Sequence, residues 1–387
     1  MNSKALFLCA LVALSSPCKA AKFTVLHSFG SAGDGAQPLG ALSLDSKGNI
    51  YGTTEGGGTD EKGTVFVVHG NGTEKVIHSF RGGHDGSEPV SGVVSSAAGL
   101  FCGVEPLGGR RGGGTVFGIS PKGKKTVLYA FRGGRHDGRY PQGSLTIFPN
   151  GTIYGTTVAG GTQDFGTIFN LTPDGTETVL HSLTDAEGDD AALGVIGDAN
   201  GVLYGVAGAG GSSFEGTIFS LTPGGVYTVL HNFTGVQNSD GTYPSGGLVF
   251  GLDGNLYGVT QLGGVNNGGT LFRISPDGTN YEILHAFEGS AGGNADDGSL
   301  PQGNLAIDGA GNVFGTTKSG GADATAGTVF EYTSDGSYRI VHTFIAATDG
   351  ASPVSGVTVG PKNTLYGTTN LGGLNNRGTV FSIKLTN

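Results

Sequence analysis

The chain has 387 residues, of which 77 are glycine and 36% are hydrophobic, and it carries a formal net charge of −10. A negative charge of this size disfavours nucleic acid and anionic membranes as whole-surface partners, because both repel it. The glycine content approaches that of disordered low-complexity chains, but the hydrophobic residues alternate in short, evenly spaced runs, which indicates a folded β-rich protein.

The first twenty residues have the pattern of a secretory signal peptide. Lys4 supplies a positive start, residues 5–14 form an apolar core, and Ala20 ends a small-residue cleavage site. The core is too short to cross a bilayer, which takes about 20 residues, and no second long apolar run follows. We therefore predict a signal peptide over 1–20 and a single secreted domain over 21–387, periplasmic or released, with no membrane span.

Cleavage would change both the charge and the cysteine content. It removes two lysines and no acid, which leaves 19 basic against 31 acidic residues and a net charge of −12. Cys102 then stands alone, so the mature chain has no intramolecular disulfide. Because Cys102 occupies a tyrosine position of the repeat described next, we expect it to be a small buried apolar residue.

Two phrases recur seven times along the chain. The first resembles Asn-Ile-Tyr-Gly-Thr-Thr, and its glycine lies at Gly52, Gly103, Gly155, Gly205, Gly258, Gly315 and Gly367. The second resembles Gly-Thr-Val-Phe and begins at Gly63, Gly114, Gly166, Gly216, Gly269, Gly327 and Gly378. Successive copies of the first glycine are 50–57 residues apart. Such a period, with strand-like segments inside each unit, is typical of propellers and solenoids.

Each unit contains four strand signals. In the first complete unit they cover 39–45, 49–54, 63–69 and 75–80, with a glycine-rich loop over 55–62. The first strand of each unit is expected to be innermost, and these strands start near Leu39, Val90, Gln142, Leu193, Ser245, Gln302 and Val354. The fourth strand, which is outermost, carries a Val-Leu-His-Ser-Phe phrase.

The first copy of that phrase precedes the first complete unit, whereas the last unit ends at its third strand. We therefore predict an all-β, seven-bladed β-propeller with four strands per blade, closed by antiparallel pairing of Phe23–Phe29 with Thr379–Leu385. This assignment places the two longer loop sets, marked by Asp-Gly-x-x-Pro and by Gly-Gly, on one face. Long loops on a rigid scaffold often carry function.

These phrases, together with Thr-Pro-Asp-Gly, make the chain similar to the GloVer (Gloeo/Verruco-type) tandem-repeat family over about residues 22–387. The resemblance implies a secreted or surface-anchored bacterial protein with propeller-like repeats. It implies no catalytic residue, because the family has no established common activity. The chain ends directly after a strand, so release rather than anchoring is expected.

The outer strands carry a repeated set of histidines: His27, His78, His181, His231, His285 and His342, with Tyr129 in the seventh copy. Outer strands lie far from the axis, since each strand adds roughly 4.8 Å, so these side chains cannot converge on one ion. We expect core or interblade histidines, no metal and no cofactor.

The Asp-Gly-x-x-Pro segments begin at Asp34, Asp85, Asp137, Asp240, Asp297 and Asp349, and the fourth unit is predicted to lack the motif. Turn chemistry explains these aspartates. A calcium site stays open only for Asn294-Ala295-Asp296-Asp297.

Six of the nine arginines fall within residues 81–139: Arg81, Arg110, Arg111, Arg132, Arg135 and Arg139. The repeat places them all on the long-loop face beside the second blade, opposite the acidic loops of later blades. Guanidinium groups match anionic oxygens in a bidentate manner. The cluster is therefore a candidate site for an acidic polysaccharide, and the alternative is a solvated charged rim.

Four more residues flank the prolines that precede the inner strands: Tyr140, Gln142, Tyr243 and Gln302. They are expected near the mouth of the central channel, either as ligand contacts or as channel lining. No nucleophile elbow, zinc spacing or phosphate loop appears in the chain.

Two classes of function remain open. The first is a secreted, non-catalytic binding or scaffold protein that acts as a monomer on an extracellular glycan or protein ligand. The second is a secreted glycoside hydrolase or polysaccharide lyase with its site at the channel mouth. The fold alone cannot choose between them. A deep pocket with two carboxylates about 5–10 Å apart would favour the hydrolase.

Overall fold

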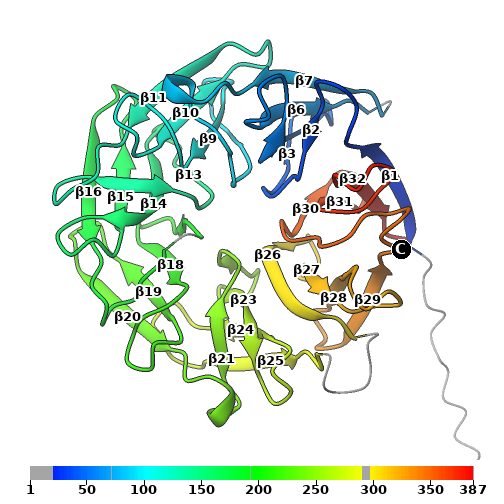
Figure 1. Cartoon of the computed structure of the whole chain (residues 1–387). Helices are drawn as coiled ribbons and strands as arrows, with labels where there is room; N and C mark the ends of the chain where they lie inside the picture. The colour runs from blue at the N-terminus through cyan, green and yellow to red at the C-terminus, as the bar shows by residue number, and fades with distance from the viewer. Residues whose placement is uncertain (1–20, 71, 192, 290–296, 387) are drawn as a thin grey trace, which may run out of the picture.

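The structure is a computed structural model that describes residues 21–70, 72–191, 193–289 and 297–386. Seven antiparallel sheets follow one another around a central axis, as Figure 1 shows by the progression of colour around the ring. The predicted seven-bladed β-propeller with four strands per blade is confirmed. The predicted signal peptide, 1–20, lies outside the described residues.

In blades 1 to 6 the four main strands run from the axis outward in chain order, and in blade 7 the outermost strand is the first strand of the chain (Figure 1). Blades 1 and 2 consist of β3 (Ser43–Leu44), β4 (Ile50–Thr54), β6 (Thr64–Val68), β7 (Glu74–Ser79), β8 (Val94–Ser95), β9 (Phe101–Glu105), β10 (Thr115–Ile119) and β11 (Lys125–Ala130). Blades 3 and 4 consist of β12 (Gly138–Pro141), β13 (Thr146–Ile147), β14 (Ile153–Gly160), β15 (Thr167–Leu171), β16 (Glu177–Ser182), β17 (Val195–Gly197), β18 (Leu203–Ala207), β19 (Thr217–Leu221) and β20 (Tyr227–Asn232).

The remaining three blades follow the same order. Blades 5 and 6 consist of β21 (Gly241–Pro244), β22 (Val249–Phe250), β23 (Leu256–Gly263), β24 (Thr270–Ile274), β25 (Glu282–Ala286), β26 (Ser299–Ile307), β27 (Val313–Ser319), β28 (Thr328–Tyr332) and β29 (Tyr338–Thr343). Blade 7 consists of β30 (Val357–Gly360), β31 (Thr364–Thr369), β32 (Thr379–Lys384) and β1 (Lys22–Ser28). The short pieces are β2 (Gly35–Ala36), β5 (Gly56–Gly57), η1 (Gly83–Asp85) and η2 (Val236–Asn238).

The N-terminal strand closes the ring as predicted. β1 pairs antiparallel with β32, from Lys22 opposite Lys384 to Ser28 opposite Thr379. Phe29, directly after β1, is fully buried and packs edge-on against Phe66 of blade 1. The first strand of the chain therefore covers the edge of the last, which would otherwise offer unpaired backbone groups to other chains.

The repeated phrases interlock inside each blade. A Cβ on Gly52 would lie 2.5 Å from the ring of Phe66, so the Tyr-Gly-Thr-Thr glycine makes room for the phenylalanine of the next strand. Thr54 and Thr64, one from each phrase, share a hydrogen bond of 2.8 Å between their hydroxyls. The same threonine pair occurs in blades 3, 5, 6 and 7.

The Asp-Gly-x-x-Pro segments differ from the expectation that they are loops. In blades 3 and 5 they form β12 and β21, which pair with the ends of β14 and β23. In these two blades the pairing ends at the proline, which has no N–H to donate, and the chain resumes nearer the axis. In blade 6, β26 continues through Pro301. Six of the seven innermost strands consequently start later than predicted: β3, for example, begins at Ser43 rather than near Leu39. In blade 6, β26 begins at Ser299, before the predicted Gln302.

The fourth unit lacks the Asp-Gly-x-x-Pro motif, as predicted, but residues 187–191 take the same place in the fold. Glu187 takes the place of the aspartate, and its carboxylate lies 3.1 Å from His181 Nε2. It also accepts the backbone N–H of Thr184 at 3.1 Å. The connection from histidine to acid is one residue shorter here than in blade 1, and the longer glutamate side chain makes up the difference.

The outer-strand histidines lie between blades, in separate seams. His231 bonds Asp240 at 3.1 Å, and its ring stacks on Tyr281 of the next blade with the ring centres 3.8 Å apart. Each of the six histidines forms an ion pair, like that of His231 with Asp240, with the acid that follows it in the chain. The expectation that these histidines do not converge on one ion is met.

Two smaller expectations concern single positions. Cys102 is buried as predicted, and burial raises the pKa of its thiol to about 11. Of the candidate calcium loop, residues 294–296 lie outside the described residues. The carboxylate of Asp297 accepts from His285 and from the Glu288 N–H, as the other motif aspartates do in their blades.

Deleting residues 21–29 should lower the melting temperature by roughly 10 °C or more. The deletion exposes β32 and removes Phe29, and loss of one buried phenylalanine side chain alone costs about 3–5 kcal/mol. Thermal melts and size-exclusion chromatography of proteins starting at residues 21 and 30 make the comparison. A shortened protein that melts unchanged and does not self-associate would contradict the closure.

Candidate functional site

A cavity of about 490 Å³ opens at the axis on the long-loop face. Residues from all seven blades line it, and we call it the mouth cavity. Its polar wall includes the amides of Gln142, Gln261 and Gln302 and the hydroxyls of Ser91 and Ser245. Asp190 is the only charged side chain among its described lining residues. The site is therefore rich in neutral hydrogen-bonding groups.

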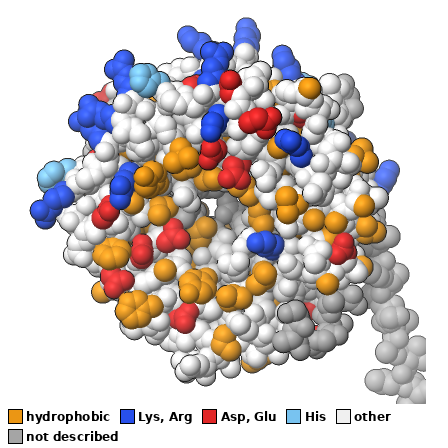
Figure 2. Space-filling view, in the orientation of Figure 1, with side chains coloured by type: hydrophobic (Ala, Val, Ile, Leu, Met, Phe, Trp, Pro, Cys, Tyr) orange, Lys and Arg blue, Asp and Glu red, His pale blue; other side chains and the backbone are white. Residues whose placement is uncertain are grey.

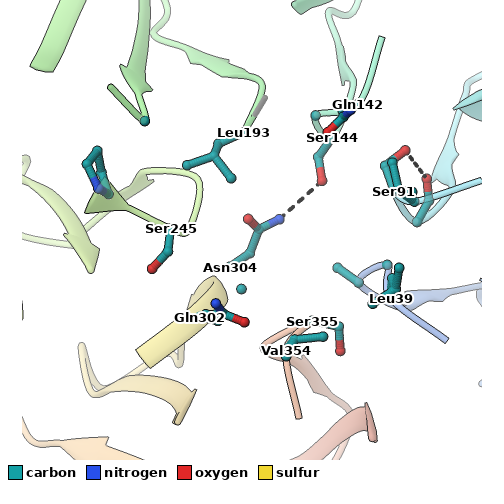
Figure 3. A pocket seen from close by; sticks show the side chains of 18 of the residues that line it. Leu39, Ser91, Gln142, Ser144, Leu193, Ser245, Gln302, Asn304, Val354 and Ser355 are labelled. Atoms are coloured by element: carbon teal, nitrogen blue, oxygen red, sulfur yellow. Dashed lines mark hydrogen bonds between the residues drawn. The ribbon is translucent and has the colours of Figure 1, made fainter. Parts of the chain in front are cut away.

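A hydrogen bond across the axis forms the floor of the mouth cavity. Asn304 of blade 6 donates through Nδ2 to Ser144 Oγ of blade 3 at 3.2 Å, and Figure 3 shows its side chain reaching between the two. Asn304 Oδ1 accepts the backbone N–H of Gly247 at 3.0 Å. Asn304 and Ser144 also line a second cavity of about 230 Å³. The Asn304 side chain thus lies between the two parts of the channel.

Glycines let the innermost segments close around the axis. A Cβ on Gly40 would lie 2.0 Å from the backbone nitrogen of Gly92, and one on Gly143 would lie 2.1 Å from that of Gly194. Parallel bridges join neighbouring segments at Ser144 with Gly194 and at Asn304 with Gly356. Contact between backbones narrows the channel enough for one asparagine side chain to cross it.

A ring of residues in the left-handed conformation surrounds the mouth. They are the last residues before the proline, or before its replacement Ala191, and all have φ between 53° and 58°: Gln37, Glu88, Tyr140, Asp190, Tyr243, Leu300 and Ser352. This backbone conformation is unfavourable for any residue other than glycine, and it is further disfavoured before proline. It is held by the preceding blade, as where the Tyr243 N–H donates to the Glu215 carbonyl at 3.1 Å.

The four predicted mouth residues separate into two groups. Gln142, Tyr243 and Gln302 line the mouth cavity, and the Tyr243 side chain is 46% exposed. Tyr140 is half-buried and is not among the lining residues; its ring centre lies 5.2 Å from the Arg139 guanidinium carbon. The φ angles of Tyr140 and Tyr243 are similar. The two side chains therefore differ in position relative to the cavity because their neighbours differ.

The six predicted arginines lie away from the axis. Figure 2 shows most basic side chains along the outer rim from β7 round to β16, whereas many hydrophobic side chains lie nearer the opening. None of the six lines the mouth cavity. We call this group, defined by Arg81, Arg110, Arg111, Arg132, Arg135 and Arg139, the arginine rim.

Nearby acids neutralise only part of the arginine rim. Arg139 pairs with Asp164 at 2.7 Å. Asp85 and Asp137 accept the backbone N–H groups of Arg81 and Arg132, at 3.1 and 2.7 Å, rather than their guanidinium groups. Within the described part of the chain, no ion pair involves the exposed side chains of Arg110, Arg111 or Arg135.

Several residues of this face were not predicted from the sequence. Neither Asn304 nor Asp190 belongs to a recognised motif. Asp190 nevertheless occupies the position in the fourth unit that Tyr243 occupies in the fifth. Three glycine-rich loops also present single exposed apolar side chains: Phe214 at 65%, Val265 at 66% and Leu374 at 82% exposure. A comparison of equivalent positions between units was the signal available for all of them.

The described residues include no helix that is long and apolar enough to cross a membrane.

The fold and the site define a closed seven-bladed propeller with a polar mouth that is obstructed near the axis. The Gloeobacter/Verrucomicrobia repeat family matches residues 14–161, 99–296 and 193–387. The chain therefore belongs to the Gloeobacter/Verrucomicrobia repeat family, which confirms the resemblance seen in its sequence. No curated protein matches the chain.

Solved structures share the architecture at low sequence identity. The extracellular domain assigned to a hybrid two-component system of B. thetaiotaomicron is 13% identical with a TM-score of 0.61, and the match covers 94% of this chain and 41% of that one. A gluconolactonase from Xanthomonas campestris is 14% identical with a TM-score of 0.47, over 95% and 90% of the two chains. The chain thus spans less than half of the first, and at 13% identity the likeness to that structure shows the fold alone.

Replacing Asn304 with alanine should lower the free energy of unfolding by about 1–3 kcal/mol, because the Gly247 N–H is left unpaired near the axis. Replacing Ser144 with alanine should cost only about 0.5–1.5 kcal/mol, because it removes one hydrogen bond and the Gly247 contact remains. Urea denaturation of the two variants measures both. Equal, small losses would show that the Asn304 side chain does not hold the floor.

Proposed function

We propose that this chain is a secreted, non-catalytic propeller that binds an extracellular acidic polysaccharide on its long-loop face. The observation that carries the proposal is the polar mouth cavity, which lies on the same face as a largely unpaired arginine rim. Sugar residues would enter the cavity, and acidic groups further along the polymer would contact the rim. Export would depend on the signal peptide predicted over 1–20.

The size and chemistry of the mouth cavity support a sugar ligand. Its volume of about 490 Å³ is within the roughly 300–1,000 Å³ of typical small-ligand sites. Each glutamine amide offers both donors and acceptors, which suits hydroxyl groups that also do both. The exposed ring of Tyr243 adds an apolar surface against which a sugar ring can pack.

The arginine rim supports an anionic ligand. The exposed guanidiniums of Arg110, Arg111 and Arg135 present fixed donors to carboxylate or sulfate oxygens. They form a local positive region on a chain whose net charge is −10. Attraction at this place and repulsion elsewhere would orient an acidic polymer toward the long-loop face.

The carboxylates available at the mouth favour binding over hydrolysis. A glycosidase of the usual kind needs two carboxyl groups flanking the scissile bond. Among the described residues that line the mouth cavity, Asp190 is the only carboxylate. The alternative of a glycoside hydrolase or polysaccharide lyase therefore has less support than a binding protein.

Changing Arg110, Arg111 and Arg135 together to serine should abolish retention on immobilised acidic glycans at low salt while the fold stays intact, because these side chains are exposed. The matched control changes Lys47, Lys122 and Lys124 to serine, which removes three exposed charges from the short turns on the face opposite the long loops. Retention of the parent should also fall as salt rises, since the Debye length is only about 10 Å at 0.1 M. Equal loss in both triple variants would point to non-specific charge attraction.

Changing Gln142 and Gln302 together to alanine should weaken glycan binding tenfold or more at every salt concentration, because the lost contacts are uncharged. Gln163 and Gln237, which are exposed and do not line the mouth cavity, supply the matched double variant. Titration against soluble oligosaccharides from the retained polymers measures both. Binding that survives the mouth variant would remove the cavity from the proposal, and release of shortened products would contradict a non-catalytic role.

A further inference from the structure

Each seam between two blades includes one residue from the outer strand of the second blade, four residues before the histidine of that strand (or before Tyr129). The identity of this residue differs among the seven seams. Four seams place a hydrogen-bond donor there. Tyr281 donates to the Asp240 carboxylate at 2.7 Å, and Lys125 lies 3.3 Å from the Asp85 carboxylate. Tyr227 and Tyr338 donate to the backbone carbonyls of the equivalent acids. The motif acid thus usually receives a donor from the neighbouring blade.

Two seams place a glutamate at this position instead: Glu74 between blades 7 and 1, and Glu177 between blades 2 and 3. A buried oxygen of each, Oε1, has no hydrogen-bond partner among the described residues. In the first of these seams Glu74 lies near Asp34, so two acceptors meet where the four seams described above pair a donor with an acceptor. Among the described residues, no lysine or arginine forms an ion pair with Asp34 or Glu74, whereas Lys125 pairs with Asp85 in the next seam.

The seam between blades 7 and 1 also contains a histidine. His27 Nε2 lies 3.0 Å from Asp34 Oδ2, and one ligand atom from each of His27, Asp34 and Glu74 lies within 4.8 Å of the others. This is the one such group of three in the described residues. Two ligands at about 2.0–2.2 Å from a Zn²⁺ ion lie roughly 3–4 Å apart, so small side-chain rotations would bring all three to coordination distance.

The donor set selects a class of ion. One imidazole nitrogen and two carboxylates suit Zn²⁺ and similar divalent transition metals, whereas Ca²⁺ and Mg²⁺ prefer oxygen alone. The His27 side chain is 20% exposed, which leaves a path from solvent. The seam with Glu177 has Tyr129 in place of the histidine, and a neutral phenol is a poor ligand for such an ion.

We propose that the seam between blades 7 and 1 binds one divalent transition-metal ion through His27 Nε2, a carboxylate oxygen of Asp34 and the carboxylate of Glu74, with water completing the coordination. The ion supplies the positive charge that Lys125 supplies in the next seam. It also links β1, the strand that closes the ring, to β7 of the first blade. Metal binding therefore strengthens the closure of the propeller.

Isothermal titration of the metal-free chain starting at residue 21 with ZnCl₂ tests the proposal, together with thermal melts in Zn²⁺ and in EDTA. The parent should bind one high-affinity equivalent and melt about 5 °C higher with saturating Zn²⁺. Glu74→Gln should weaken Zn²⁺ binding at least tenfold and lose the shift in melting temperature. The matched control, Glu177→Gln, should behave as the parent does.

A second variant distinguishes loss of the metal site from misfolding. His27→Tyr reproduces the tyrosine of the seam between blades 2 and 3, so the chain itself provides the precedent for its packing. It should melt close to the parent in EDTA and show no high-affinity Zn²⁺ site. Equal Zn²⁺ binding by parent, Glu74→Gln and His27→Tyr would overturn the proposal in favour of adventitious binding by exposed histidines.

Protonation is the competing explanation for the missing charge. Burial, and after it the charge of Asp34, raises the pKa of Glu74 to about 7, with His27 the opposing neighbour. An acid whose pKa is raised in the folded state stabilises the fold below its unfolded pKa, and this stability is lost as the pH rises through about 7. If Zn²⁺ changes nothing and Glu74→Gln removes only such a pH-dependent loss, a proton fills the site and the metal proposal is wrong.

Discussion

A buried carboxylate between blades is the interaction on which the ring depends. In blade 5, Asp240 accepts hydrogen bonds from the His231 ring, the Thr234 backbone N–H and the Tyr281 hydroxyl. Burial opposes the charge, but these donors hold the pKa of Asp240 below its usual value. One acid thereby joins the outer strand of one blade, the connection to the next blade and the outer strand of that blade.

The geometry around this carboxylate determines what the long-loop face can present. The motif segment continues along the blade until proline interrupts it, and the residue before the proline is held left-handed by the preceding blade. Seven side chains therefore leave nearly identical backbone positions around one opening. Their chemistry ranges from Tyr243 to Asp190 and Leu300, so a uniform scaffold supports a face without symmetry.

The same separation of scaffold and variation applies in the seams. Every seam uses the acid, while the residue that meets it from the next blade is a tyrosine, a lysine, a phenylalanine or a glutamate. Stacking of Tyr281 on His231 and the Lys125–Glu105 pair at 2.9 Å satisfy the local groups in different ways. Glu74 does not, and this contrast with its neighbours makes the seam between blades 7 and 1 a candidate ion site.

The sequence by itself determined the architecture. The number of blades, the strand order and the closure of β1 on β32 follow from phrases such as Tyr-Gly-Thr-Thr, because Gly52 and Thr54 make contacts within one blade that repeat with the same spacing in the others. Motif spacing also located Asp34 and its equivalents, and it placed Gln142, Tyr243 and Gln302 at the mouth. The Glu187 segment was not recognised from the sequence because a glutamate replaces the motif aspartate and Ala191 replaces the proline.

Only the tertiary structure decided which side chains meet. Asn304 and Ser144 are 160 residues apart and become partners once the ring brings blades 3 and 6 to opposite sides of one axis. The arginine rim and the mouth cavity are separate regions, and Tyr140 packs with Arg139 rather than lining the opening, because side-chain direction depends on neighbours from another blade. A repeat encodes the contacts that recur in every unit, whereas contacts across the axis and between unlike blades exist only after the ring has closed.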